Sequence, residues 1–309
     1  MNTFIILLSL FLIILVGAGA RKFNLLPEEA SKYFNKFIFY ISVPAVVFLS
    51  IATLDIGELS SFLPFILANI TVVFTGYILA YLILRYFNIS TNKKGVLVYS
   101  GNAGNVIYFG FPLLLSIYGT EHFNLGVMYA TVVITIGDLM GFYLLGINKG
   151  GEKLKIKDIA RDFLGNPVVR ATIAGVFVAI INISLPKFLS DSLETLSKTT
   201  TGLALFSLGI YLYGKLNFDD FKYALVTSFF KLLLLPLITY IMVYFLFKMT
   251  GPAAETSVIM ASMPTAVFSL IVADAYGLDK SLTSNAIVLS SILFLLTSGL
   301  WICILNIIG

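Results

Sequence analysis

Charge, cysteine and histidine are scarce in this sequence of 309 residues. Asp, Glu, Lys and Arg make up 12% of the chain, about half of the roughly 25% found in soluble domains. This leaves too little polar surface to cover a water-soluble fold. The single cysteine, Cys303, excludes a disulfide framework and a cysteine-based metal site, and the single histidine, His122, excludes a histidine metal cluster. We therefore expect no metal and no cofactor.

Apolar residues replace the missing charge. They make up 59% of the chain, and its mean hydropathy is +0.97. A bilayer core about 30 Å thick is crossed by a helix of roughly 20 mostly apolar residues. The apolar runs predict an all-α membrane protein with ten spanning helices, at residues 3–20, 33–53, 62–87, 95–118, 123–147, 167–184, 190–213, 220–247, 254–276 and 283–308.

Lysine and arginine are unevenly distributed among the loops between these spans. Sixteen of the 20 lie in or next to odd-numbered loops, six of them around the fifth loop. Because positive residues accumulate on the cytoplasmic side, we expect a multi-pass protein of the cell membrane with both termini outside and the basic loop 149–166 in the cytoplasm. The net charge of +4 then marks topology and contact with anionic lipid, and no nucleic-acid partner is expected.

Short sequence matches recur at an offset of 158 or 159 residues. Leu26-Pro27 returns as Leu185-Pro186, Phe48-Leu49-Ser50 is echoed by Phe206-Ser207-Leu208, and Tyr118-Gly119 returns as Tyr276-Gly277. These matches predict a first five-helix repeat at 1–148, a cytoplasmic linker at 149–166 and a second repeat at 167–309. Since five is odd, the second repeat is inverted in the membrane, which is a recurrent plan of secondary transporters.

Helix-breaking residues stand at corresponding places in the fourth and ninth spans. The fourth contains Gly101-Asn102-Ala103-Gly104-Asn105, and the ninth contains Ser262-Met263-Pro264-Thr265. Two glycines and two asparagines disfavour a continuous helix, and proline removes a backbone donor. Unwound backbone at membrane depth persists only where protein encloses it. Paired interruptions therefore predict a transport site, although kinks that serve packing remain an alternative.

At these residues the chain resembles the auxin efflux carrier family, which includes plant PIN-type carriers and many prokaryotic relatives. The resemblance covers nearly the whole chain. It rests on the two interrupted segments, on Gly110-Phe111-Pro112, on Ala273-Asp274-Ala275-Tyr276-Gly277, on Gly165-Asn166-Pro167 and on Ala204-Leu205-Phe206-Ser207-Leu208-Gly209. It implies ten helices in which the fourth and ninth are broken and cross, as in bile-acid symporters and sodium/proton antiporters.

The resemblance also implies roles for individual residues. Asn105 matches the asparagine that contacts the substrate carboxylate in plant members, Pro264 matches the crossover proline of helix nine, and Lys231 falls where plant carriers place a cation. The chain departs from the plant pattern at Gly104, where those carriers have a proline. It also lacks an acidic residue in helix three, where Asn69, Thr71 and Thr75 are the polar candidates.

A helix that restarts in mid-membrane exposes unpaired amides with a partial positive charge of about +0.5. Two such ends favour an anion, so we expect a small organic anion, most simply a carboxylate, as substrate. Unwound carbonyls could instead hold a cation. The expected substrate-binding residues are Asn102, Gly104, Asn105, Val106, Ile107, Met263, Pro264 and Thr265.

Two charged residues fall inside predicted spans, and such residues are hypotheses for function. Asp138 lies on helix five and Lys231 on helix eight. We interpret them as ion-coupling or supporting residues, with H⁺ or Na⁺ as the coupling ion. The alternative is a purely structural role, in which Asp138 pairs with Lys231 or with helix-end donors.

These features together indicate a secondary active transporter that works by alternating access. The alternatives are a sodium/proton exchanger or sodium-coupled symporter on the same fold, and a membrane sensor or receptor. We do not expect an enzyme. An intramembrane aspartyl protease needs the motif Gly-x-Gly-Asp, and in the corresponding segment before Asp138 this chain has Thr135 in place of the first glycine. An intramembrane serine enzyme needs a histidine at membrane depth, and the only histidine, His122, falls in a predicted loop. The expected partners are the substrate anion and the lipid bilayer, and a homodimer remains open.

Overall fold

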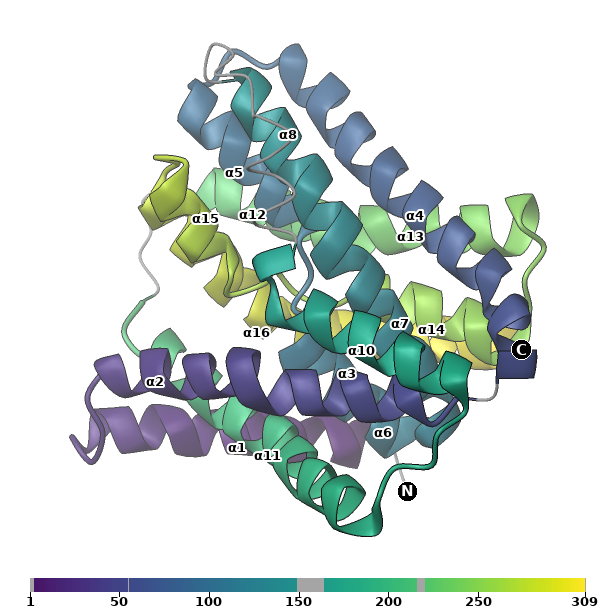
Figure 1. The fold of residues 1–309 in the computed structure, drawn as a ribbon. Coiled ribbons are helices and arrows are strands. Elements are labelled where there is room, and N and C mark those ends of the chain that lie inside the picture. Colours follow the sequence, from purple (N-terminus) through teal and green to yellow (C-terminus); the bar gives the residue numbers. More distant parts are fainter. Residues whose placement is uncertain (1–2, 55, 149–163, 216–219, 309) are drawn as a thin grey trace. The chain divides into compact units, whose positions relative to one another are not determined.

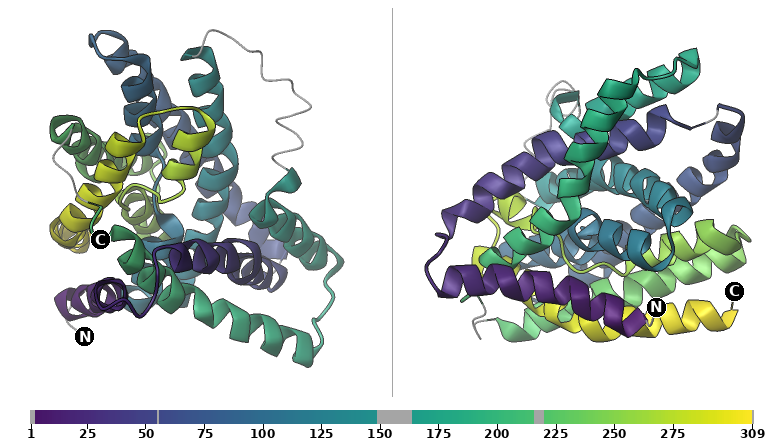
Figure 2. Two further views of the ribbon diagram at one scale, coloured as in Figure 1. Left: turned by 90° about the vertical axis from the view of Figure 1, so that its left-hand side faces the viewer. Right: turned by 90° about the horizontal axis from the view of Figure 1, so that it is seen from below.

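The computed structural model describes residues 3–54, 56–148, 164–215 and 220–308, and helices dominate these ranges (Figures 1 and 2). The only strand-like pairing among the described residues is an isolated bridge between Gly104 and Thr265. The prediction of an all-α membrane protein is confirmed in this coarse form. The predicted cytoplasmic linker 149–166 lies mostly outside the described residues, which resume at Leu164.

Six helical stretches are long and apolar enough to cross a bilayer, by length and composition, among the described residues: Ile5–Lys22, Glu29–Ala52, Phe62–Arg85, Thr120–Gly146, Phe221–Leu246 and Lys280–Ile307. Two shorter apolar helical stretches, Val106–Ile117 and Pro167–Ile181, fall below that length. The count of ten spanning helices therefore stays a prediction.

The remaining predicted spans fall short for visible reasons. The fourth is interrupted between α5 (Thr91–Asn102) and the π-helical segment η2 (Val106–Gly110), and the ninth between α14 (Gly251–Ala261) and α15 (Ser269–Ala275). The seventh lies in α11 (Lys187–Leu212), which is long enough but carries charged residues in its first half.

The described chain forms two compact units, each drawing helices from both predicted repeats. The first unit comprises residues 1–66, 107–131 and 156–213. Its helices are α1 (Thr3–Lys22), α2 (Glu29–Phe37), α3 (Val43–Ala52), the start of α4 (Ile56–Arg85), α6 (Phe111–Ile117), nearly all of α7 (Thr120–Val132), α10 (Pro167–Ile181) and α11. Within this unit α1 packs along α11, and α3 packs along α10.

The second unit comprises residues 67–106, 132–155 and 214–309. It contains the rest of α4 together with α5, α8 (Asp138–Asn148), α12 (Phe221–Phe229), α13 (Leu235–Tyr240), α14, α15 and α16 (Lys280–Ile308). Within this unit α16, in yellow, runs beside α12, in light green (Figure 2). The division into two sequential repeats, 1–148 and 167–309, stays a prediction.

Local sequence fixes where α10 begins and ends. Asn166 precedes the helix and its Oδ1 accepts the Val168 N–H at 2.9 Å, while Pro167 occupies the first helical position, where no backbone donor is needed. At the other end Asn182 adopts a left-handed conformation with φ of 51°. The motif Gly165-Asn166-Pro167 is thus a helix start.

Glycines bring the helices of the first unit into backbone contact. A Cβ at Gly209 of α11 would lie 1.9 Å from the Ile14 carbonyl oxygen of α1, and a Cβ at Gly17 would lie 2.1 Å from the Phe206 carbonyl oxygen. Real Cβ atoms do not approach backbone oxygens so closely. Only glycine at these two positions allows α1 and α11 to pack at this distance.

We expect Gly209→Ala to lower the thermal stability of the purified protein. The added methyl group must push α1 and α11 apart, and overpacking of this kind costs about 1–3 kcal/mol. Gly202→Ala on the same helix is the matched control, because a Cβ there meets nothing within 4 Å. Equal melting temperatures for the two variants would contradict the close approach.

Candidate functional site

The two helix interruptions of the second unit pair with each other. Residues 103–105 follow the end of α5, and residues 262–268 follow the end of α14. The Asn105 N–H donates to the Pro264 carbonyl oxygen at 2.7 Å, and the Ala266 N–H donates to the Ala103 carbonyl oxygen at 2.9 Å. Gly104 and Thr265 lie opposite each other in this antiparallel bridge. We call residues 103–105 and 264–266 the paired segments.

Pairing solves the problem that unwound backbone creates in a membrane. An unsatisfied amide or carbonyl away from water costs several kcal/mol, so interrupted helices persist only where other groups satisfy the freed backbone. Here each segment provides hydrogen-bond partners for some of the backbone groups of the other. The predicted interruptions at Gly101–Asn105 and Ser262–Thr265 thus coincide with the observed helix ends, to within a few residues.

Thr265 anchors the paired segments. It is fully buried, its N–H donates to the Ser290 hydroxyl oxygen of α16 at 3.0 Å, and its own hydroxyl donates to the Ser100 carbonyl oxygen of α5 at 3.0 Å. The hydroxyl hydrogen is therefore engaged within the protein. This contact positions the paired segments, and a role of Thr265 in substrate binding stays a prediction.

The two asparagines at the first interruption, Asn102 at the end of α5 and Asn105 in the first paired segment, differ in the hydrogen bonds of their side chains. The Asn102 amide nitrogen donates to the Val98 carbonyl oxygen at 2.8 Å, one turn back along α5. The Asn105 side chain is only 5% exposed, and its amide nitrogen has no hydrogen-bond partner among the described residues. Buried amide donors are almost always paired, so an unpaired one marks a place where a ligand can be bound. Asn105 is the stronger binding candidate.

The other predicted site residues fall in or next to the paired segments. Met263 and Pro264 are buried, and Val106, which follows Asn105 directly, is 2% exposed. Gly104 is half-buried. Ile107 belongs to the first unit, whereas the rest of the predicted binding set lies in the second.

Lys231 lies against the paired segments and caps a helix end. It belongs to the π-helical segment η4 (Phe230–Leu234), its side chain is 1% exposed, and its Nζ donates to the Ala261 carbonyl oxygen at 2.6 Å. Ala261 is the last residue of α14. A Cβ at Gly104 would lie 3.1 Å from the Lys231 Nζ, so glycine at this position leaves room for the ammonium group.

Asp138 is held by a tyrosine that the sequence analysis did not identify. The Tyr99 hydroxyl of α5 donates to the Asp138 Oδ1 at 2.7 Å. Gly141 lets the two helices approach, because a Cβ there would lie 2.7 Å from the Tyr99 ring and 3.0 Å from the Tyr77 hydroxyl. The structure therefore gives Asp138 and Lys231 different partners, and the alternative that they pair with each other is wrong.

The Tyr99 ring continues into an aromatic stack. It lies 6.0 Å from the Phe142 ring at an interplanar angle of 9°, and Phe142 lies 5.5 Å from the Tyr276 ring at 15°. The stack joins α5, α8 and the end of α15. Because the Ala103 N–H donates to the Tyr99 carbonyl oxygen at 2.8 Å, Tyr99 links Asp138 directly to the first paired segment.

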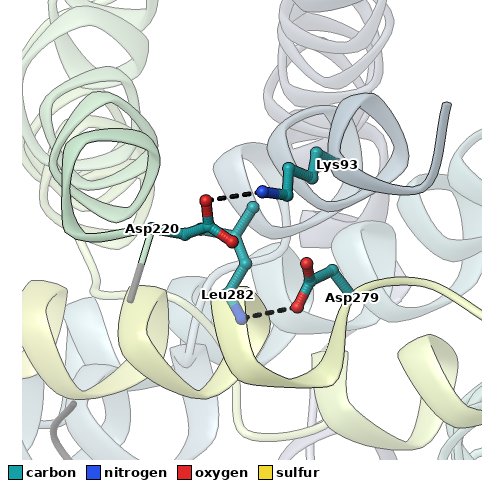
Figure 3. A network of polar contacts seen from close by, with 4 residues as sticks. All are labelled: Lys93, Asp220, Asp279 and Leu282. Atoms are coloured by element: carbon teal, nitrogen blue, oxygen red, sulfur yellow. Dashed lines mark hydrogen bonds and ion pairs between the residues drawn. The ribbon is translucent and has the colours of Figure 1, made fainter. Parts of the chain in front are cut away.

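Charged residues tie three helices of the second unit together at one end (Figure 3). Lys93, near the start of α5 and just outside the predicted span 95–118, donates to Asp220 before α12 at 2.5 Å. This hydrogen bond raises the pKa of Lys93, so its ammonium group is charged at neutral pH. Asp279 also attracts Lys93, and its carboxylate accepts the Leu282 N–H at 3.0 Å at the start of α16.

Comparisons with known proteins agree with these observations. A family model described as membrane transport protein matches residues 3–164 and 152–302. An uncharacterized transporter of Methanocaldococcus jannaschii is 28% identical over 96% of both chains. A candidate malonate transporter of Rhizobium meliloti is 24% identical over 88% of this chain and 86% of its own. Auxin efflux carrier component 8 of Arabidopsis thaliana is 21% identical over 91% of this chain and 90% of its own.

The predicted resemblance is confirmed by these matches, because they extend over nearly the whole chain and include a plant auxin efflux carrier. The chain therefore belongs to the membrane transport protein family, which includes the auxin efflux carriers.

Proposed function

We propose that this protein is a secondary active transporter that moves a small organic anion across the membrane by alternating access. The single observation that carries the proposal is the Asn105 amide nitrogen, buried and unpartnered among the described residues, next to backbone segments that interrupt two helices. A buried N–H donor without an acceptor is suited to bind a carboxylate oxygen.

The same proposal includes ten spanning helices in two inverted five-helix repeats, with the fourth and ninth crossing. Reciprocal contacts within the first unit support it. A Cβ at Gly17 would meet the Phe206 carbonyl oxygen, and one at Gly175 would meet the Phe48 carbonyl oxygen. Gly17 and Gly175 are 158 residues apart, as are Phe48 and Phe206. An offset that exchanges the two members of a contact is the pattern that a two-fold repeat produces.

A further pair supports the same offset. The hydroxyls of Ser42 and Thr200, also 158 residues apart, lie 2.7 Å from each other. Equivalent residues of two repeats contact one another only near the axis that relates them. In this proposal both termini face outside, the basic residues of 149–166 face the cytoplasm, and the protein acts in the cell membrane.

A carboxylate is the substrate class that the site favours. Two neutral asparagines lie in or beside the first paired segment, and Asn105 offers a donor without the cost of burying another charge. The similarity to a candidate malonate transporter points to the same chemistry. Asp138, held by Tyr99, supplies the acidic group for ion coupling, with H⁺ or Na⁺ as the ion.

Proteoliposome uptake tests this function. Purified protein is reconstituted, and uptake of radiolabelled malonate, acetate and indole-3-acetate is measured with and without proton and sodium gradients. We expect saturable uptake of at least one carboxylate, above that of empty liposomes, by about tenfold or more. If no carboxylate is transported but the protein exchanges Na⁺ for H⁺ across the liposome membrane, it is a sodium/proton exchanger instead.

A further inference from the structure

Lys231 is a buried cation without an acidic partner. Its Nζ has three hydrogens, and the acceptor found for them is the Ala261 carbonyl oxygen at 2.6 Å. No carboxylate forms an ion pair with Lys231 within the part of the chain that the structure describes. Among the described residues, the group that compensates this ammonium is thus a backbone carbonyl and not Asp or Glu.

The ammonium group of Lys231 lies at the C-terminal end of α14, a position that a free cation would also favour. The C-terminal end of a helix carries a partial negative charge of about −0.5, and Ala261 ends α14. In transporters with interrupted helices, such ends and the unwound carbonyls beside them coordinate Na⁺. Lys231 reaches this end from η4 and stands beside Gly104 of the paired segments.

The surrounding residues are built to hold the side chain there. The π-helical segment η4 adds an extra residue to one turn, and the Trp301 Nε1 of α16 donates to the Leu232 carbonyl oxygen at 2.8 Å. The Phe230 ring lies 3.1 Å from where a Cβ of Gly101 would stand. Gly101 and Gly104 thus make room for Phe230 and Lys231, respectively. This pairing gives a physical reason for a glycine at 104.

We propose that Lys231 is a tethered cation that replaces a free metal cation beside the paired segments, so that the transporter binds its anion without Na⁺. The inference rests on the proposed anion transport and adds the source of positive charge to it. The ammonium group is bound covalently and loses no entropy of association, so it is present in every binding cycle. Its charge acts on the anion through a low-dielectric interior, where electrostatic interactions are strong.

Cation replacement tests the inference. Equilibrium binding of radiolabelled malonate, acetate and indole-3-acetate is measured for the wild type in sodium chloride and in choline chloride. We expect affinities equal within about twofold in the two salts. For Lys231→Ala we expect at least a tenfold loss in choline, with recovery in sodium chloride or in n-propylammonium chloride. The n-propylammonium ion has the atoms that the substitution removes, and 1-propanol is the uncharged control.

Two further variants make the result decisive. Lys222→Ala, on the exposed start of the same helical stretch, controls for general loss of charge. Lys231→Met keeps the unbranched side chain as far as Cε without the charged Nζ, and serves if the alanine variant does not fold. We expect it to lose at least tenfold in affinity in choline. Melting curves in the same salts check folding, and bound n-propylammonium should raise the melting temperature of Lys231→Ala alone.

Each outcome separates the inference from the proposed function. A wild type that binds a carboxylate only in sodium overturns the tethered cation and leaves anion transport standing. Full binding by Lys231→Ala or Lys231→Met in choline also overturns it, as does a folded Lys231→Ala that neither cation restores. A wild type that binds and transports no carboxylate in either salt overturns the proposed function itself.

Discussion

Replacing Asn105 by aspartate is expected to abolish anion binding. Asn105 is 5% exposed and its amide nitrogen is unpartnered among the described residues, so the substitution exchanges a free donor for a buried acceptor that repels the substrate. Asn105→Ala removes the donor without adding charge. A hydrogen bond to a charged group contributes about 1.5–3 kcal/mol, so we expect the alanine variant to lose roughly ten- to a hundredfold in affinity. Uptake and equilibrium binding of the carboxylate panel measure both effects.

The control for this experiment comes from the same helix. Asn92 is exposed in the first turn of α5, and Asn92→Asp makes the same chemical change where a negative charge suits the helix end. We expect wild-type binding from that variant. An Asn105→Asp protein that binds a carboxylate as tightly as Asn92→Asp would remove Asn105 from the site.

The helix breaks were predictable because they follow from local chemistry. Glycine, asparagine and proline disfavour helix whatever surrounds them, so Gly101–Asn105 and Met263–Pro264 point to the observed ends of α5 and α14. Because the two interruptions stand at equivalent positions in the two halves of the chain, they were the best candidates for a transport site. What a single position cannot reveal is its partner, such as the pairing of Gly104 with Thr265 across 161 residues of sequence.

The sequence does not reveal which hydrogen bonds the side chains of the site make. Asn102 and Asn105 are the same residue three positions apart, yet one donates to Val98 and the other stays without a partner among the described residues. The sequence also does not reveal that the Thr265 hydroxyl donates to the Ser100 carbonyl oxygen. Such differences depend on where α5, α14 and α16 come together, and that arrangement depends on packing contacts distributed over the whole unit.

The partners of the two charged residues, Asp138 and Lys231, could not be predicted from the sequence either. Two isolated charges in apolar spans suggested a pair, because a buried charge is costly without compensation. The structure compensates each one separately, Asp138 with the Tyr99 hydroxyl and Lys231 with a helix-end carbonyl. Hydrogen bonds to neutral groups can hold a buried charge, and the sequence alone does not reveal which neutral groups are near.

Replacing Asp138 by asparagine is expected to uncouple transport from its ion gradient. Asp138 is half-buried in the second unit, where the titratable groups that interact with it are the phenols of Tyr99 and Tyr77. A carboxyl group in such a setting can bind and release a proton or hold Na⁺, whereas an amide of the same shape can do neither. The amide oxygen introduced by Asp138→Asn would still accept from the Tyr99 hydroxyl, so the fold and the first paired segment should stay intact.

Two assays on the same proteoliposomes separate coupling from binding. In counterflow, where labelled and unlabelled substrate exchange without a net driving force, we expect Asp138→Asn to keep at least about a third of wild-type activity. In uptake driven by a proton or sodium gradient, we expect its accumulation to fall about tenfold or more, to the level of equilibration. Asp274→Asn, at an exposed carboxylate that pairs with Lys280, is the matched control and should still accumulate substrate.

Which of the two activities Asp138→Asn loses, accumulation or counterflow, identifies the role of Asp138. If accumulation survives in Asp138→Asn, the carboxylate does not carry the coupling ion and its bond to Tyr99 is structural. If counterflow is lost as well while the protein still melts as the wild type does, Asp138 acts on substrate binding through Tyr99 and the 103–105 segment. Loss of accumulation alone follows only if one carboxylate links the ion to a site that binds the anion by itself. Because Lys231 stands beside Gly104 of that segment, such a result would divide the two tasks between two residues: Asp138 would respond to the gradient, and Lys231 would hold the anion.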